Sequence, residues 1–207
     1  MKTFLSKNIS LIILVGIFLF AYAIRAQNIV PERLLSFDPI FEYRYTKYLV
    51  DWGHLPAWDE ISYYVGRAVD SAFTQPFLFY ISAFLYKIIS PLFGFSLITS
   101  VSYLSAIYGA LIVIPAFFLG KELSNEYGGL LTALFIGTAP QILVRTFGSS
   151  YDTDTWILFF IITTLYFGWN ALKKPNVKNI ALASAGFSAF LITWSNFLYT
   201  FMILAAF

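Results

Sequence analysis

The chain has 207 residues, of which 59% are hydrophobic, 20% are aromatic and only 12% are charged. Soluble domains carry about 25% charged residues, so this composition excludes a soluble enzyme or a nucleic-acid-binding protein and indicates a membrane protein. The net charge of +2 is too balanced to imply a polyanionic partner, and the absence of cysteine excludes disulfides, thiolate metal sites and thiol catalysis.

Five apolar stretches are predicted to cross the membrane. A bilayer core about 30 Å thick needs about 20 apolar residues per helix, and five stretches come near that length. The last of them has no polar tail or helix stop signal after Leu204, which predicts that the chain is the front part of a longer protein. The stretches are residues 9–24, 97–119, 128–144, 156–172 and 180–207.

The first stretch has two interpretations. It follows Lys2 and Lys7 and ends near the small residues Ala21 and Ala23, as a cleaved secretory signal peptide does. Its length and the further membrane segments behind it favour an uncleaved span. In either case its downstream end is external.

The run from Phe77 to Ile89 is too short for a comfortable span, carries Lys87, and lies between Pro76 and Pro91. If it spanned the membrane, the lysine-rich turn at 173–178 would lie on the side opposite the N-terminal lysines. That arrangement violates the tendency of positive charge to remain cytoplasmic. We therefore expect this run to lie in the interface, with all these lysines and Lys121 on the cytoplasmic side.

Two charged segments then become external, the loop 25–96 and the turn 145–155. The first part of the loop is a small polar module that we expect to pack on the spans as short amphipathic pieces. Between residues 25 and 70 it contains seven acids and five bases: Glu32, Asp38, Glu42, Asp51, Asp59, Glu60 and Asp70 against Arg25, Arg33, Arg44, Lys47 and Arg67.

The segment Phe37-Asp-Pro-Ile-Phe-Glu-Tyr-Arg44 is typical of a helix start. Pro39 suits the first helical position and disfavours helical dihedrals at Asp38, so Asp38 is predicted to be the N-cap. From this motif alone, capping is the commoner role for such an aspartate. The helix that follows carries an apolar stripe suited to the membrane interface, made by Phe41, Tyr45, Tyr48 and Leu49.

The turn 145–155 contains Asp152 and Asp154 at the predicted membrane edge. Alternate carboxylates on an extended turn can face one hard cation, although either aspartate could instead cap the helix that starts near Trp156. One cap needs only one acid, and two close carboxylates repel each other. A cation between them, or Arg145, is the simplest explanation for the pair.

Arg145 itself can face this pocket or extend to lipid phosphates, as arginines at span ends often do. The single histidine, His54, lies beside Gly53 and Pro56, where solvent or a backbone hydrogen bond is expected in place of metal ligation.

The order of three motifs resembles the oligosaccharyltransferase catalytic-subunit family. They are FDPIFEYR at 37–44, GKEL at 120–123 and GSSYDTD at 148–154, and the similarity extends from about Leu34 to Trp194. The pattern looks most like an archaeal-type single-subunit enzyme. The resemblance implies an all-α polytopic membrane fold of the GT-C glycosyltransferase class, in a cell membrane, with the active site on the external face.

The resemblance also implies the chemistry. Family members transfer an oligosaccharide from a polyprenyl (dolichyl) phosphate or diphosphate carrier to asparagine in Asn-x-Ser/Thr sequons. Asp38, Asp152 and Asp154 match the family's catalytic, metal-binding acids, with Mn²⁺ or Mg²⁺ as cofactor. Arg145 matches an arginine for which a role near the carrier's phosphates is expected.

Two family features are absent from these residues, a third metal-site acid and a Trp-Trp-Asp sequon-reading motif in a C-terminal soluble domain. We therefore expect residues 1–207 to be inactive alone. Two alternatives remain open: another glycosyltransferase that uses lipid-linked sugars, and an ion-coupled transporter or scaffold subunit. A transporter site should lie near the bilayer midplane, whereas these acids lie at span ends.

Overall fold

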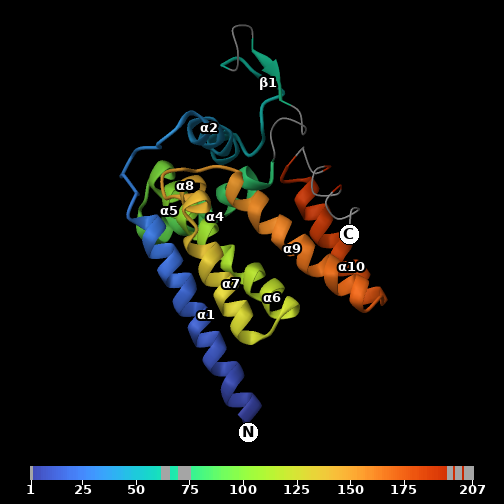
Figure 1. Ribbon diagram of the computed structural model, residues 1–207. Helices are drawn as coiled ribbons and strands as arrows, with labels where there is room; N and C mark the ends of the chain where they lie inside the picture. The colour runs from blue at the N-terminus through green and yellow to red at the C-terminus, as the bar shows by residue number, and fades with distance from the viewer. Residues whose placement is uncertain (1, 62–65, 70–75, 195–197, 199–201, 203–207) are drawn as a thin grey trace.

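A computed structural model describes residues 2–61, 66–69, 76–194, 198 and 202, with side chains from Ile9 onward. The described residues are mostly helical (Figure 1). The elements are α1 (Lys2–Ala26), α2 (Phe37–Trp52), β1 (Trp58–Asp59), β2 (Arg67–Ala68), α4 (Phe77–Phe93), α5 (Leu97–Leu111), α6 (Val113–Leu123), α7 (Glu126–Thr138), α8 (Pro140–Thr146), α9 (Asp154–Lys173) and α10 (Val177–Leu191).

Helices occur at each of the five predicted spans. Among the described residues, three are long and apolar enough to cross a membrane: Ile9–Ala26 of α1, Leu97–Leu123 formed by α5 and α6 together, and α9. The pair α7 and α8 becomes a fourth candidate if it counts as one broken span. Helix α10 is apolar but shorter.

The stretch expected as one span over 128–144 is not a straight helix. It consists of α7 and α8, which meet at Ala139 with a bend of 55°. The reason is Pro140, which has no N–H to donate to the carbonyl four residues earlier and is well placed at the start of a new helix. The carbonyls at the end of α7 therefore need donors from elsewhere in the chain.

The helix expected over 180–207 also differs from the prediction. Helix α10 ends at Leu191, and the backbone N–H groups of Thr193 and Trp194 both donate to the carbonyl of Phe190. Most of the remaining stretch, residues 195–197, 199–201 and 203–207, lies outside the described residues.

Helices α6 and α7 form a close antiparallel pair. A Cβ atom on Gly129 would lie 2.7 Å from the carbonyl oxygen of Phe117, and one on Gly120 would lie 2.3 Å from Oγ1 of Thr132. Only glycine permits the two backbones to approach this closely, which is the usual way helices pack in membranes, where lipid tails are as apolar as leucine.

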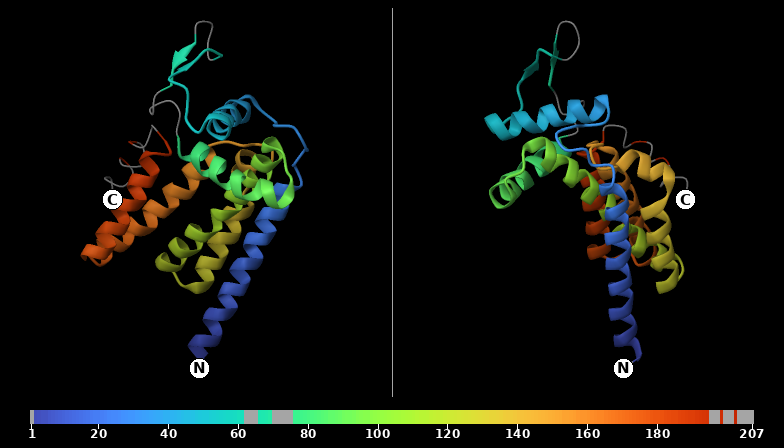
Figure 2. Two further views of the ribbon diagram at one scale, coloured as in Figure 1. Left: turned by 180° about the vertical axis from the view of Figure 1, so that it is seen from behind. Right: turned by 90° about the vertical axis from the view of Figure 1, so that its left-hand side faces the viewer.

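Helices α2 and α4 lie across the end of α1 and do not run alongside it (Figure 2, right). Their contact is aromatic: Tyr45 of α2 is fully buried and stacks on Phe79 of α4 with ring centroids 5.4 Å apart. Helix α4 continues through Pro91 to Phe93, so this proline does not end it. This orientation agrees with the interfacial position expected for both segments.

The lysine-bearing turns gather at one end of the molecule, together with the start of α1 (Figure 1). Lys173 at the end of α9 pairs with Glu122 at the end of α6 at 3.1 Å, which fixes these two turns side by side. Helix α2 and the loop from α8 to α9 lie at the opposite end (Figures 1 and 2). The external position of this second end stays a prediction, which rests on the distribution of lysines.

Cysteine labelling tests this sidedness, and the 207 residues contain no cysteine that would interfere. Single cysteines in place of Ser36, Ser124 and Lys174 should react differently with a membrane-impermeant thiol reagent on intact cells. We expect Ser36→Cys to be labelled from outside, and the other two only after permeabilisation. Labelling of Ser124→Cys on intact cells would contradict the topology.

Candidate functional site

The first half of the site is one face of α2. Asp38, Glu42 and Thr46 are spaced four residues apart, so their side chains follow one another along the same side of the helix. At the far end of this face, Oγ1 of Thr46 lies 2.7 Å from the hydroxyl of Tyr151, which is fully buried. This contact brings the face of α2 against the loop that carries Asp152.

The predicted cap of α2 is wrong by two residues. Ser36 occupies the N-cap position without a side-chain hydrogen bond, and Asp38 lies inside the first turn. The helix can start before Pro39 because the first-turn N–H groups have no helical partners in any case. Asp38 is exposed and has no hydrogen bond or ion pair with the described residues, so its carboxylate is available for a ligand.

The second half of the site is the loop between α8 and α9. It is held from several directions: Ser105 of α5 donates to the carbonyls of Phe147 and Ser150, at 3.1 and 2.9 Å. Ser149, which adopts a positive φ of 63°, accepts at its carbonyl from the N–H of Leu35 at 3.0 Å. The segment that leads into α2 and the acidic loop are thus bonded to each other.

Arg25 anchors the base of this loop. It was predicted to begin the external polar loop, but α1 continues to Ala26 and Arg25 is fully buried. Its Nε donates to Oγ1 of Thr146 at 2.9 Å, and its Nη1 donates to the carbonyl of Gly137 at 2.8 Å. The carbonyl of Arg25 accepts from the N–H of Gly148 at 3.0 Å.

The guanidinium of Arg25 therefore supplies a donor at the α7–α8 break that Pro140 creates, and the same residue fixes the start of the acidic loop. Helix α5 comes so close to it that a Cβ on Gly109 would lie 2.5 Å from Nε of Arg25. Among the described residues, the hydrogen-bond partners of Arg25 are carbonyls and a hydroxyl, and none is an acid.

The two acids of the loop have different surroundings. Oδ1 of Asp152 accepts from the hydroxyl of Thr153 at 3.1 Å and from the N–H of Asp154 at 3.3 Å, so it partly caps α9. Asp154 is the first residue of α9 and lies 3.7 Å from Nη1 of Arg145, whose side chain is 67% exposed. Arg145 thus faces the acidic pair, one of the two positions considered for it.

The predicted acids lie near one another even though Asp38 is more than a hundred residues from the other two. Burial raises the pKa of Asp152, hydrogen bonds from Asp154 and Thr153 oppose this, and repulsion from Asp38 adds to the rise. Asp38, Asp152, Asp154 and Arg145 thus lie at one end of the molecule and influence one another's charge, but no three acids among the described residues converge closely enough to hold a metal ion.

Glu42 was counted only as part of the polar module, but it is the buried member of this group. It is 8% exposed, and its Oε2 has no hydrogen-bond partner within the described part of the chain. Burial, followed by repulsion from Asp152, Asp38 and Asp154, raises its pKa well above the ordinary value. Its spacing of four residues from Asp38 places both on one side of the helix, but that spacing alone does not indicate burial.

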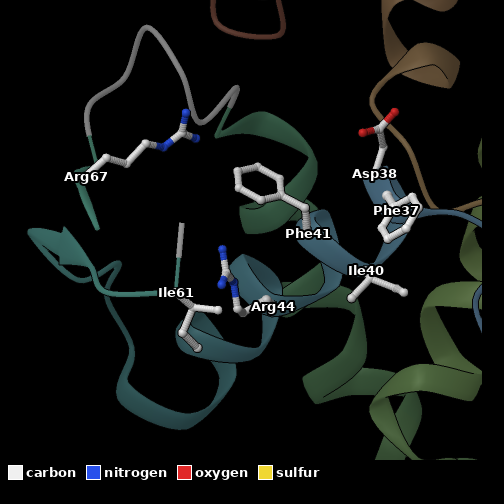
Figure 3. A pocket seen from close by; sticks show the side chains of 7 residues that line it. All are labelled: Phe37, Asp38, Ile40, Phe41, Arg44, Ile61 and Arg67. Carbon is white, nitrogen blue, oxygen red and sulfur yellow. The ribbon is translucent and has the colours of Figure 1, made fainter. Parts of the chain in front are cut away.

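A cavity of about 850 Å³ opens beside Asp38 (Figure 3). Phe41 lies between Asp38 and two arginines: the guanidinium carbons of Arg44 and Arg67 lie 5.5 and 5.4 Å from the centre of its ring. Nη2 of Arg44 also pairs with the buried carboxylate of Asp59 at 2.6 Å. The cavity therefore has an acidic side and a basic side.

His54 lies outside this group. Its Nδ1 lies 3.0 Å from the carbonyl oxygen of Leu55 on the protein surface, which is the kind of backbone contact that was expected.

A family model described as Oligosaccharyl transferase STT3, N-terminal, matches residues 8–207. The Arabidopsis thaliana protein named dolichyl-diphosphooligosaccharide–protein glycosyltransferase subunit STT3B is 30% identical over 170 residues, which cover 79% of this chain and 23% of that protein. The subunit STT3 of Saccharomyces cerevisiae is 27% identical over 203 residues, covering 92% of this chain and 28% of that protein. The chain thus spans about a quarter of the length of these relatives.

The archaeal oligosaccharyltransferase AglB of Archaeoglobus fulgidus has the same fold. Its complex with an inhibitory peptide and a dolichol-phosphate superposes with a TM-score of 0.82 and 23% identity, over 97% of this chain and 25% of that chain. Two further structures of this enzyme match at TM-scores of 0.81 and 0.78, over 94% and 93% of this chain, with 23% identity, and cover 26% and 25% of those chains. One contains Zn and sulfate, and the other is tethered with an acceptor peptide containing the NVT sequon.

These matches confirm the prediction of an all-α polytopic membrane fold of the GT-C class. They also confirm the resemblance drawn from the three motifs. The chain belongs to the oligosaccharyl transferase STT3 family, in the part that the family's N-terminal model describes.

Proposed function

We propose that this chain forms the donor- and metal-binding part of an enzyme that transfers an oligosaccharide from a polyprenyl phosphate or diphosphate carrier to asparagine in Asn-x-Ser/Thr sequons. The observation that carries the proposal is the gathering of Asp38, Asp152 and Asp154 from two distant segments at one end of the molecule. Relatives bearing the names of glycosyltransferase subunits, and the dolichol-phosphate and sequon peptide of the Archaeoglobus enzyme, support it.

The donor set suits a divalent cation, which we propose to be Mn²⁺ or Mg²⁺. Asp38, Asp152 and Asp154 offer carboxylate oxygens, which hard cations prefer, and a positive charge would relieve their mutual repulsion. Within the described residues, no three acidic, histidine or cysteine side chains converge closely enough to hold a metal ion. Binding therefore requires a side chain to turn, or a donor from outside these residues.

When bound, the cation would stabilise the negative charge that develops on the carrier's phosphate as the glycosidic bond breaks. Arg145 is exposed beside Asp154 and is suited to bind the same phosphate. The acidic side chains have a second task, because the asparagine amide is a poor nucleophile. A carboxylate that accepts hydrogen bonds from the amide can orient it towards the sugar.

The position of these acids opposite the lysine-bearing turns supports an active site on the external face of the membrane. Hydrogen bonds hold α2 and the segment before it against the acidic loop, so this end of the molecule has a fixed shape. A lipid-linked donor can be held on it.

A transfer assay tests the proposal. The purified full-length protein should glycosylate a fluorescent peptide with an Asn-x-Thr sequon when given a lipid-linked donor. Excess chelator should abolish the reaction, and Mn²⁺ or Mg²⁺ should restore it. A peptide with glutamine in place of the asparagine serves as the control and should remain unmodified. Transfer at full rate in chelator would contradict the metal-dependent mechanism.

A further inference from the structure

Glu42 is the feature of the site that the proposed function does not yet use. It lies on α2 one turn after Asp38 and one turn before Thr46, so its side chain points towards the acidic loop. The bond between Thr46 and the hydroxyl of Tyr151 keeps α2 and the loop together beside it. Glu42 is thus enclosed between the helix and the loop, behind Asp38.

The surroundings of Glu42 are unfavourable for an isolated carboxylate. Its Oε2 is buried without a hydrogen-bond partner within the described residues. The charged groups that act on it are Asp152, Asp38 and Asp154, all of its own sign. A buried polar atom without a partner destabilises the fold, and three nearby carboxylates increase the penalty for a charged group.

Two basic groups of the site have acidic partners other than Glu42. Arg145 faces Asp154 at 3.7 Å, and Arg44 forms an ion pair with Asp59 at 2.6 Å. Arg44 also lines the cavity on the other side of Phe41 (Figure 3). A basic side chain therefore does not account for the presence of a buried carboxylate at position 42.

A cation bound among the four acids would account for it. Because no three of these side chains converge closely enough as they stand, binding the cation requires them to turn towards it. We propose that Glu42 is a further carboxylate donor of the divalent-cation site, in addition to Asp38, Asp152 and Asp154. Glutamate has one more methylene than aspartate, so from one turn behind Asp38 it can extend to the same region as the shorter side chain. This inference rests on the metal dependence of the proposed function.

Metal binding, not activity, is the direct test. The full-length protein is stripped of metal, and its affinity for Mn²⁺ is measured from the free-ion signal in electron paramagnetic resonance. Glu42→Gln keeps the shape of the side chain and removes its charge. We expect it to raise the Kd for Mn²⁺ by about tenfold or more. The matched control is Glu60→Gln, an exposed glutamate of the same external module, which should leave Kd unchanged.

A thermal measurement separates ligation from a structural role. Without metal, Glu42→Gln should unfold at the same temperature as the wild type or higher, because the variant loses the repulsion among the acids. Saturating Mn²⁺ should raise the unfolding temperature of the wild type more than that of the variant.

The outcomes also distinguish this inference from the proposed function. If Glu42→Gln binds Mn²⁺ as tightly as the wild type while Asp152→Asn binds it more weakly, the proposed metal site is supported and the role of Glu42 in it is refuted. If the wild type itself binds no Mn²⁺ or Mg²⁺, the proposed metal-dependent function fails, and the role of Glu42 fails with it.

Discussion

Asparagine in place of Asp38 or Asp152 is expected to slow glycan transfer by the full-length protein by about a hundredfold or more, since metal sites of this kind supply several kcal/mol to the transition state. Asp154→Asn should have a similar or somewhat smaller effect. Asparagine preserves the size of the side chain and removes the charge that attracts a hard cation. The substitution therefore tests ligation with little disturbance of the fold.

At both positions, the structure indicates that asparagine removes the charge and preserves most of the local contacts. Asp38 does not cap α2, so its replacement removes no capping hydrogen bond and costs only the modest interaction of a first-turn carboxylate with the helix dipole. At Asp152, the carbonyl oxygen of an asparagine can still accept from Thr153 and from the N–H of Asp154. Thermal unfolding temperatures should therefore remain near that of the wild type.

Initial rates of glycopeptide formation at several Mn²⁺ concentrations give the measurement. The two variants should also need more metal for half-maximal rate. Asp51→Asn is a suitable control, because Asp51 is an exposed residue of the same helix whose ion-pair partner is Lys47, four residues away. Full activity with unchanged metal dependence in the Asp38 and Asp152 variants would show that these acids have only a structural role.

The second large effect is expected at Arg25. Arg25→Met retains an apolar chain of similar length but removes the donors to Oγ1 of Thr146 and to the carbonyls of Ala21 and Gly137. Ala21 lies inside α1, where its carbonyl also accepts from a helical N–H, and Thr146 keeps its bond to the carbonyl of Ile142. The main loss is therefore at the carbonyl of Gly137. An unsatisfied buried group costs about 1–3 kcal/mol, so the free energy of unfolding should fall by about that amount. Glycan transfer should fall as well, because the start of the acidic loop loses its anchor.

Thermal unfolding in detergent and the transfer assay measure these two effects. Arg25→Lys keeps the charge but replaces a planar group of several donors by a single ammonium, so it should restore only part of the stability. Arg33→Met is the control, an exposed arginine in the segment after α1. The anchoring role would be wrong if Arg25→Met unfolded and transferred glycan like the wild type.

The apolar stretches and the two acidic motifs could be predicted from the sequence because both are local signals. A run of apolar residues predicts a membrane helix wherever its neighbours lie, and a pair of acids at a span end is visible without a structure. The break in the stretch 128–144 was also within reach, since Pro140 lies inside it.

The roles of Arg25 and Glu42 could not be predicted in the same way. Arg25 bonds to residues 112 and 121 positions away, and nothing in its own segment indicates those partners. Glu42 stands in a module of mixed charge, where an exposed position is the ordinary expectation. Only the packing of α2 against the acidic loop buries it and surrounds it with charges of its own sign.

The hydrogen bonds between the segment before α2 and the acidic loop affect how a substrate can approach. The N–H groups of Val30 and Leu35 both bond to Ser149, and Thr46 contacts Tyr151 farther along. A bulky headgroup forced between α2 and the loop would have to break all three contacts. The open cavity beside Asp38 avoids these contacts, and a ligand held there lies among Asp38 and the guanidinium groups of Arg44 and Arg67. An anionic headgroup in this cavity would therefore meet positive charge as well as the acid.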